Sequence, residues 1–182
     1  MAESLAGQLL LAGPTLLDPN FTRTVVLIGV HGEDGAMGVV LNRPSEVTVG
    51  EAVPQLAEAV GEEERVHIGG PVAPGAIVLL AEFSDPDPAA VLVLGRIGFP
   101  APDAGLEEIV QATMRGRVFA GYAGWGAGQL DAEVENGDWI ALAALPEDVF
   151  SEEPEGLWGG VLKRKGGSYA LLARMPVDPT VN

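Results

Sequence analysis

The sequence has no cysteine among its 182 residues. The chain can therefore form no disulfide bond, no thiolate metal site and no cysteine nucleophile. This absence is compatible with the cytoplasm, where disulfides are rare, and we expect a cytoplasmic protein. Long apolar runs are missing too, and the run "LLLA" near the N-terminus is too short for a signal peptide or a membrane span. We expect no association with a membrane.

Basic residues are scarce, with 10 lysines and arginines against 26 aspartates and glutamates and a formal net charge of −16 at pH 7. Proteins that bind nucleic acids normally carry a basic surface, and phosphate backbones repel a chain this acidic. We therefore expect no direct binding to nucleic acid. Two small basic clusters, Lys163–Lys165 and Arg115 with Arg117, are interpreted as charges that complement the dipole at helix C-termini.

Glycine and proline are abundant, with 25 and 14 residues, and their spread along the chain indicates many turns between short elements. Apolar periodicity predicts strands at 7–12, 24–31, 36–42, 65–72, 75–83, 90–99, 117–124, 138–145 and 168–173, and helices at 49–60, 105–115, 126–137 and 155–164. Strands outnumber helices, and hairpins are present. The pattern predicts an α+β fold with a mostly antiparallel, strongly bent sheet. Residues 1–182 are expected to form a single domain with a frayed tail at about 175–182.

The helix predicted at 49–60 carries both a start signal and a defect. Thr48 is followed three residues later by Glu51, which is the spacing of a capping box. Pro54 lies inside the same segment and removes a helical hydrogen bond. The segment is therefore expected to start late or to kink.

Motifs that carry catalytic or metal chemistry are absent from the sequence. His31 and His67 each follow an apolar strand without metal-site spacing, so both are interpreted as strand-end residues that make ordinary hydrogen bonds. No serine lies in a G-x-S-x-G or S-x-x-K motif. The glycine-rich stretch 121–130, "GYAGWGAGQL", matches neither G-x-G-x-x-G nor the P-loop. The sequence therefore favours a protein without enzymatic activity, cofactor or bound metal.

Polar residues stand at the ends of several predicted strands. Arg23 opens the predicted hairpin that Asn42 and Arg43 close, and the two ends of an antiparallel pair lie near each other. Two interpretations remain open for these arginines. They pair with Asp18 and Glu46 and fix the loop, or they form a pocket for an anion or carboxylate, which suits the forked guanidinium group.

Four sequence blocks closely resemble the successive signature blocks of the AlgH/YqgE family of bacterial proteins. They are "LLLAGPTLLDPNFTRTVVLIGVH", "GAMGVVLNRP", "HIGGPV" and "GYAGWGAGQLDAEV", and the resemblance runs from about residue 6 to about residue 160. It implies a bifurcated sheet that is curled into a partial β-barrel and flanked by helices. The family is named after a proposed role in transcriptional regulation, and no enzymatic activity is settled for it. Gly29 departs from the family pattern, which usually has a polar or acidic residue there.

The resemblance also supplies candidate binding residues. The signature positions map to Asn20, Arg23, His31, Asn42, Arg43, Gly69, Gly70, Trp125, Gly126 and Gln129. We hypothesise a cleft around Trp125, Arg23 and Arg43, with glycines that allow a ligand close to the backbone. In the alternative interpretation, Trp125 covers one end of the core and the glycines make room for it.

Three functions remain open at this point. The leading hypothesis is a non-enzymatic cytoplasmic binding or regulatory protein that holds a protein or small-molecule ligand in this cleft. The first alternative is an enzyme for a small anionic metabolite, with His31 or a carboxylate as acid or base. The second alternative is a transcriptional regulator that acts indirectly through a protein partner.

Overall fold

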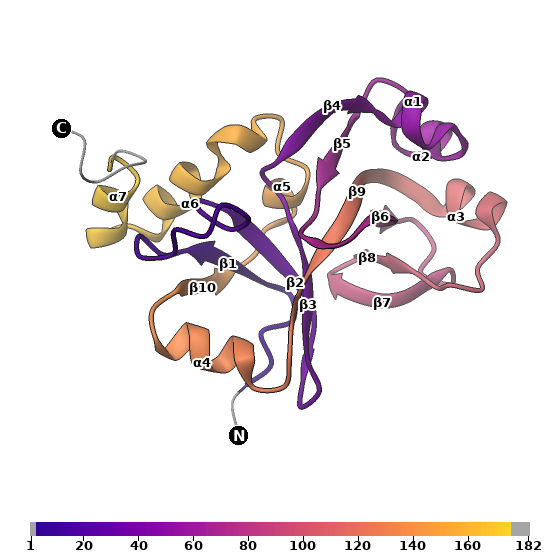
Figure 1. Ribbon diagram of the computed structural model, residues 1–182. Coiled ribbons are helices and arrows are strands. Elements are labelled where there is room, and N and C mark those ends of the chain that lie inside the picture. The colour runs from indigo at the N-terminus through magenta and orange to yellow at the C-terminus, as the bar shows by residue number, and fades with distance from the viewer. Residues whose placement is uncertain (1–2, 176–182) are drawn as a thin grey trace.

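The computed structural model describes residues 3–175, which form ten strands and seven α-helices (Figure 1). The strands are β1 Gln8–Ala12, β2 Val25–Gly32, β3 Gly35–Val40, β4 Pro44–Thr48, β5 Arg65–Ile68, β6 Val72–Phe83, β7 Ala89–Leu94, β8 Ile97–Pro100, β9 Thr113–Trp125 and β10 Trp139–Ala143. The helices are α1 Val49–Ala52, α2 Ala57–Val60, α3 Leu106–Ala112, α4 Gln129–Glu135, α5 Pro146–Val149, α6 Leu157–Lys165 and α7 Ser168–Leu172, and 3-10 turns cover Pro54–Leu56 (η1) and Pro154–Gly156 (η2).

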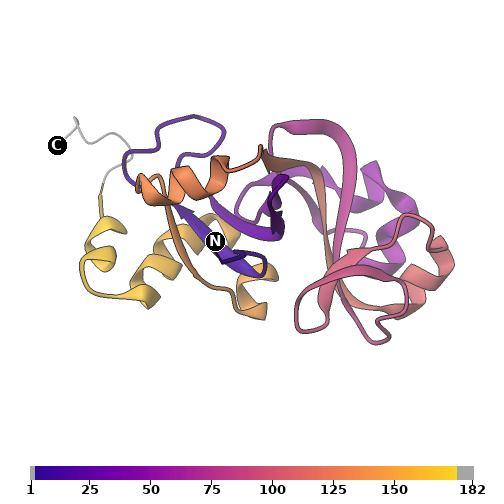
Figure 2. The same cartoon turned by 90° about the horizontal axis from the view of Figure 1, so that it is seen from below.

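The strands form one branched sheet. Its main path runs in the order β10-β1-β2-β3-β9-β6-β8-β7 with antiparallel neighbours, and β5 joins β9 in parallel and β4 in antiparallel orientation. Figure 2 shows the result as two arms, with indigo β1 and yellow α6 in one and pink β6–β8 in the other. The predicted α+β fold, with a mostly antiparallel sheet curled into a partial barrel and flanking helices, is confirmed.

The branch point is in β9. Phe119 and Ala120 pair with both β5 and β6, whereas Ala123–Trp125 pair with β3. Gly121 lies between these two sections with a φ of 73°, and a Cβ there would come within 2.7 Å of the Gly70 carbonyl oxygen. Glycine is required because an L side chain fits neither this backbone conformation nor this space. The glycine-rich stretch therefore turns the strand from one arm into the other.

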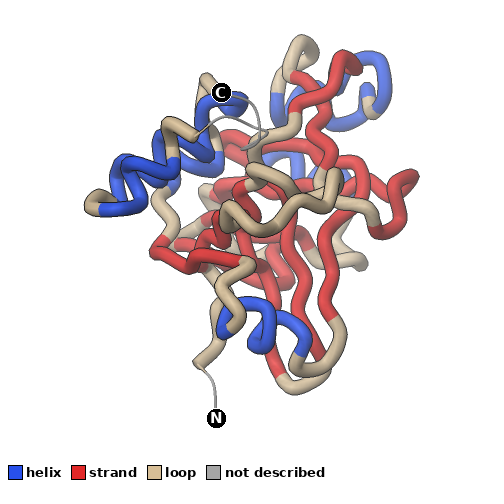
Figure 3. The backbone as a smooth tube through the Cα atoms, turned by 60° about the vertical axis from the view of Figure 1, so that its left-hand side comes forward, coloured by secondary structure: helices blue, strands red, loops and turns tan. Residues whose placement is uncertain are grey.

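The apolar core explains why "LLLA" is continuously hydrophobic. Leu9 and Leu11 on one face of β1 pack in a cluster with α6, and Leu10 and Ala12 on the other face pack in a cluster with Trp139. A strand buried on both faces needs no polar alternation. The helices, blue in Figure 3, lie at the periphery of the sheet. No helix in residues 3–175 is long and apolar enough to cross a membrane.

The segment predicted as a helix at 49–60 is broken, as the proline in it predicts. α1 ends at Ala52, η1 begins at Pro54, and α2 follows from Ala57. The Thr48 hydroxyl accepts a hydrogen bond from the Glu51 amide at 3.3 Å and so caps α1. The capping residue Thr48 and the proline at position 54 were therefore sufficient to predict where this helical segment begins and that it is interrupted.

Three predictions were wrong. The strand predicted at 90–99 is the hairpin β7–β8, which turns at Gly95 with a φ of 59°. The strand predicted at 168–173 is helix α7, since a short apolar run carries no period that separates strand from helix. The helix predicted at 105–115 ends at Ala112, and Arg115 and Arg117 lie in β9 rather than at a helix C-terminus. Of the predicted frayed tail, residues 176–182 lie outside the described residues.

Gly29, which departs from the family pattern, lies where β8 meets β2. The register of β2 and β3 shifts between Ile28 and Val30, and a Cβ on Gly29 would stand 2.6 Å from the Phe99 ring. The absence of a side chain therefore lets Phe99 of β8 pack against the main chain of β2 and helps to close the half-barrel.

We expect Gly29→Ala to lower the free energy of unfolding by about 1–3 kcal/mol, because the added methyl group overlaps the Phe99 ring. Urea unfolding monitored by tryptophan fluorescence measures this loss. Gly32→Ala in the same strand is the control, since its Cβ would meet nothing within 4 Å. Adding Phe99→Leu to Gly29→Ala should recover part of the loss. Equal stability of Gly29→Ala and Gly32→Ala would contradict the packing argument.

Candidate functional site

Asn42 holds the loop of residues 18–24, which we call the signature loop. Its side-chain oxygen accepts a hydrogen bond from the Val25 amide at 2.9 Å, and its amide group donates to the Arg23 carbonyl at 2.8 Å. Arg23 has a φ of 55°, a conformation that side chains rarely adopt. The side chain of Asn42 thus fixes a strained turn at the start of β2.

The two arginines of the predicted anion pocket donate to main-chain carbonyls. Arg43 donates through its two Nη atoms to Asn20 at 2.8 Å and to Thr22 at 3.1 Å, and burial lowers its pKa. Arg23 lies over the Trp158 ring at 4.7 Å and donates to the Met175 carbonyl. These contacts support the role of the arginines in fixing the loop. The predicted partners Asp18 and Glu46 were wrong, because the described hydrogen bonds of both guanidinium groups go to main-chain carbonyls.

His31 and Trp125 connect the sheet to neighbouring segments. The His31 Nδ1 atom accepts a hydrogen bond from the Leu5 amide at 2.9 Å, and its Nε2 atom lies 3.3 Å from the Asp131 carboxylate. The Trp125 indole donates to Glu133 at 2.7 Å. Asp131 and Glu133 both lie on α4. Both aromatic side chains therefore hold α4 against the strand ends.

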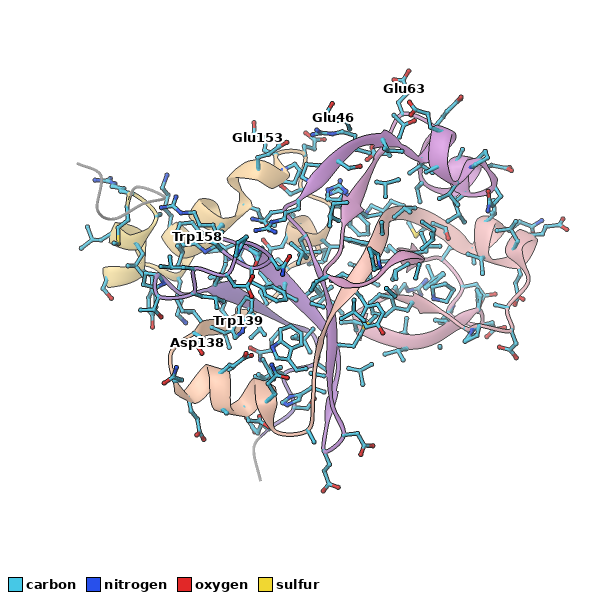
Figure 4. All side chains as sticks on the ribbon, in the orientation of Figure 1. Glu46, Glu63, Asp138, Trp139, Glu153 and Trp158 are labelled. Atoms are coloured by element: carbon cyan, nitrogen blue, oxygen red, sulfur yellow. The ribbon has the colours of Figure 1, made fainter. Side chains whose placement is uncertain are left out.

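The Trp125 ring is 7% exposed and packs inside an aromatic cluster. Its centroid lies 6.3 Å from Phe21 and 5.9 Å from Trp139, and Figure 4 shows Trp139 beside α4. Gln129 begins α4 by accepting a hydrogen bond from the Gly126 amide at 3.0 Å. The structure thus brings together His31, Trp125, Gly126 and Gln129 at the start of α4.

Gly69 and Gly70 allow two main chains to meet. A Cβ on Gly69 would stand 2.3 Å from the Gly121 carbonyl oxygen, and one on Gly70 would stand 2.2 Å from the Tyr122 main chain. Gly69 also forms two main-chain hydrogen bonds: its amide donates to the Ala120 carbonyl, and its carbonyl accepts from the Val40 amide. The space beside these glycines is filled by β9. The hypothesis of a ligand cleft shared by Trp125, Arg23 and Arg43 stays a prediction.

A cavity of about 460 Å³ lies elsewhere, between β5, β9 and the segment that follows α5. We call it the His67–Arg117 cavity. It is lined by Pro44, Val60, Glu63, Glu64, Arg65, His67, Arg115, Gly116, Arg117, Phe150, Ser151, Glu152 and Pro154.

The arginines and the histidine of the lining come from two adjacent strands. Arg65 and His67 alternate on β5, and Arg115 and Arg117 alternate on β9, so each pair projects from one face of its strand. β5 and β9 are parallel neighbours, with His67 opposite Phe119. The sequence signal was the repeated spacing in "RVH" and "RGR". It was missed because Arg115 and Arg117 were interpreted as charges at a helix C-terminus and His67 as a strand-end residue with ordinary hydrogen bonds.

Arg117 is a buried cation with one edge that lacks a hydrogen-bond acceptor. Its side chain is 10% exposed, and its Nη1 atom donates to the carbonyls of Val149 and Ser151 at 3.2 and 3.1 Å. Its Nη2 atom lies 3.9 Å from the Glu64 carboxylate, and its Nε atom has no partner. Burial lowers the pKa of this guanidinium. The Nε–Nη2 edge is the fork with which arginine binds an oxyanion through two parallel hydrogen bonds.

His67 is the second buried group with an unpartnered nitrogen. It is 2% exposed, and its Nδ1 atom lies 3.2 Å from the Arg65 carbonyl. A carbonyl only accepts, so we assign the ring proton to Nδ1, which leaves a lone pair on Nε2. Burial and the charge of Arg117 lower the pKa of His67 to about 4. Within residues 3–175, His67 Nε2 and Arg117 Nε are the two buried side-chain polar atoms without a partner.

The other two arginines of the cavity lining have acidic partners close by. Arg65 lies 3.2 Å from Glu155, and Arg115 lies 3.0 Å from Glu82 and over the Phe150 ring. Figure 4 shows Glu63 directed away from the molecule. Across residues 3–175, no group of three or more His, Cys, Asp or Glu residues is arranged to hold a metal ion.

We expect Asn42→Ala to lower the free energy of unfolding by about 1–3 kcal/mol, because it leaves the Val25 amide without its partner. Asn20→Ala is the matched control, since Asn20 is exposed and its described hydrogen bonds use main-chain atoms. Urea unfolding compares the two variants. A stable Asn42→Ala protein would remove the structural role assigned to Asn42.

The low pKa of His67 makes stability depend on pH. Between pH 6.5 and about 4 the unfolded chain binds a proton on His67 that the folded chain does not bind. Stability is therefore lost as the pH falls through this window, by about 3 kcal/mol in total. His67→Gln should remove this component. Unfolding free energies of both proteins at pH 7 and pH 4 give the comparison, and equal losses in both would contradict the assignment.

Comparison with known proteins agrees with this architecture. The family model described as AlgH-like matches residues 9–170. A UPF0301 protein of Mycolicibacterium smegmatis is 43% identical, covering 97% of this chain and 90% of that protein, and one of Thermobifida fusca is 43% identical, covering 98% and 96%.

Two solved structures share the fold. The crystal structure of a Corynebacterium diphtheriae protein has a TM-score of 0.84 and 31% identity, covering 95% of this chain and 93% of that one. The solution structure of the AlgH protein from Pseudomonas aeruginosa has a TM-score of 0.70 and 30% identity, covering 97% and 96%. The chain belongs to the AlgH-like family, whose biochemical function is not established.

Proposed function

We propose that this protein is a non-enzymatic cytoplasmic binding protein that takes a small oxyanion into the His67–Arg117 cavity. The observation that carries the proposal is the Nε–Nη2 edge of the buried Arg117 side chain, where Nε has no hydrogen-bond partner and Nη2 has only the Glu64 carboxylate at 3.9 Å. A buried charge is costly unless it is paired and hydrogen-bonded. A bound carboxylate or phosphate would supply the hydrogen bond that Nε lacks and a closer charge partner than Glu64 at 3.9 Å.

The surroundings of Arg117 suit a small organic ligand. A volume of about 460 Å³ is in the range of small-molecule sites. Phe150, Val60 and Pro44 provide apolar surface beside the charged groups. We therefore expect a ligand that combines an oxyanion with a less polar part. The arginines of the cavity must bind this anion although the net charge of the protein, −16, repels anions.

The histidines favour binding over catalysis. Both ring nitrogens of His31, the acid or base of the enzyme hypothesis, face partners within the chain, at Leu5 and Asp131. His67 faces the cavity, but a base with a pKa of about 4 removes protons poorly at neutral pH. The absence of cysteine is compatible with the cytoplasm.

Amide chemical-shift mapping of the labelled protein with inorganic phosphate and with acetate tests the proposal. We expect shifts at residues 65–67 and 115–117 with at least one of the anions. Arg117→Lys keeps the charge but loses the fork, and it should weaken the binding about tenfold, the equivalent of one charge-assisted hydrogen bond.

Lys163→Gln is the control for charge, because Lys163 is an exposed cation on α6 away from the cavity lining. It should bind as the unmodified protein does. Shifts confined to the signature loop and Trp125 would instead support the cleft predicted from the sequence. The absence of shifts at residues 65–67 and 115–117 with both anions would refute the proposed function.

A further inference from the structure

We propose that the His67–Arg117 cavity selects an oxyanion that carries its own proton, and that its ligand class is the phosphate monoester. The inference rests on the proposed function and specifies the ligand of the same cavity. It predicts discrimination between phosphate and sulfate, which have the same tetrahedral shape.

The two unpartnered nitrogens are buried in residues of the cavity lining, and they make opposite demands on a ligand that reaches them. Arg117 Nε is a hydrogen-bond donor and requires an acceptor oxygen. His67 Nε2 is an acceptor, because the Arg65 carbonyl holds the ring proton on Nδ1. A group that satisfies both must present a bare oxygen and a hydroxyl. A monoprotonated phosphate presents both on one phosphorus atom.

His67 does not readily become a donor. Burial disfavours its protonation most, followed by the charge of Arg117 on β9. The hydrogen bond to the Arg65 carbonyl favours protonation, and the charges of Arg65 and of Glu155 on η2 have smaller, opposite effects. Arg115, Glu63, Glu64 and Glu152 complete the ionisable groups that line the cavity. With a pKa of about 4, the protonated form of His67 is about 100 times less populated than the neutral form at pH 6.

This cost separates the two anions. Phosphate monoesters have a second pKa of about 6, so about half of the molecules carry a P–OH group at pH 6. Sulfate has no proton at this pH and leaves the His67 lone pair facing a bare oxygen, or it requires His67 to be protonated. The apolar lining at Phe150, Val60 and Pro44 gives the ester group of a monoester a surface to contact.

Calorimetric titrations with phenyl phosphate, inorganic phosphate and sulfate at pH 6 and equal ionic strength test the inference. We expect phenyl phosphate to bind at least tenfold more tightly than sulfate. Phenyl phosphate should also bind more tightly than inorganic phosphate if an ester is the ligand, and the reverse order would identify inorganic phosphate instead and overturn the monoester assignment. Raising the pH to 8 should weaken phosphate binding, because the P–OH group ionises.

His67→Gln tests the role of the lone pair, because its amide can turn to donate or accept. The preference for phosphate over sulfate should fall to about threefold or less in this variant. His31→Gln makes the same change outside the cavity lining and should keep the preference. His67→Asn is the second variant if His67→Gln does not fold.

The outcomes separate the inference from the proposed function. Equal affinity of the unmodified protein for phenyl phosphate and sulfate would overturn the inference and leave an oxyanion site in place. Binding of none of the three anions would overturn both. An unchanged preference in His67→Gln and His67→Asn would remove His67 from the selection.

Discussion

The main chain of β9 is the constraint on which the rest of the structure depends, because it forms ladders with three strands. It pairs with β5 on one edge and β6 on the other, and past Gly121 it pairs with β3. Such close approach is possible because Gly69, Gly70 and Gly121 have no side chains. The same arrangement places the basic residues of β9 next to those of β5. The branch of the sheet and the wall of the cavity are thus consequences of one strand.

Local sequence patterns predicted much of the fold, but they could not predict features that depend on contacts between distant segments. The hairpin of β2 and β3 follows from runs of β-branched residues and the turn residues between them, and the broken helix follows from Pro54. These signals act within a few residues. The role of Arg115 and Arg117 could not be read in this way, because it depends on the parallel pairing of β9 with a strand about 50 residues earlier. Composition and periodicity predicted only a bent, mostly antiparallel sheet. The family resemblance added the branched sheet that is curled into a partial barrel.

The candidate site shows the same division. Sequence blocks shared with the AlgH-like family drew attention to Asn42, Arg43 and Trp125, and the structure gives each of these side chains a partner within the chain. The cavity is instead marked by a lack of partners at His67 and Arg117. Missing hydrogen bonds cannot be recognised in a sequence, since they depend on what the fold fails to bring close. In this protein, membership of a family signature motif therefore does not indicate which side chains have a hydrogen-bonding atom without a partner.

The pairing of β1 with β10 has a consequence for how the chain is made. Gln8 pairs with Ala143, so one edge of β1 finds its partner only after most of the polypeptide has been synthesised. At 5–20 residues per second, that edge is exposed on the ribosome for on the order of ten seconds. An unpaired apolar strand edge is a template for association with other chains. A strand that is buried on both faces in the finished protein thus needs protection during translation.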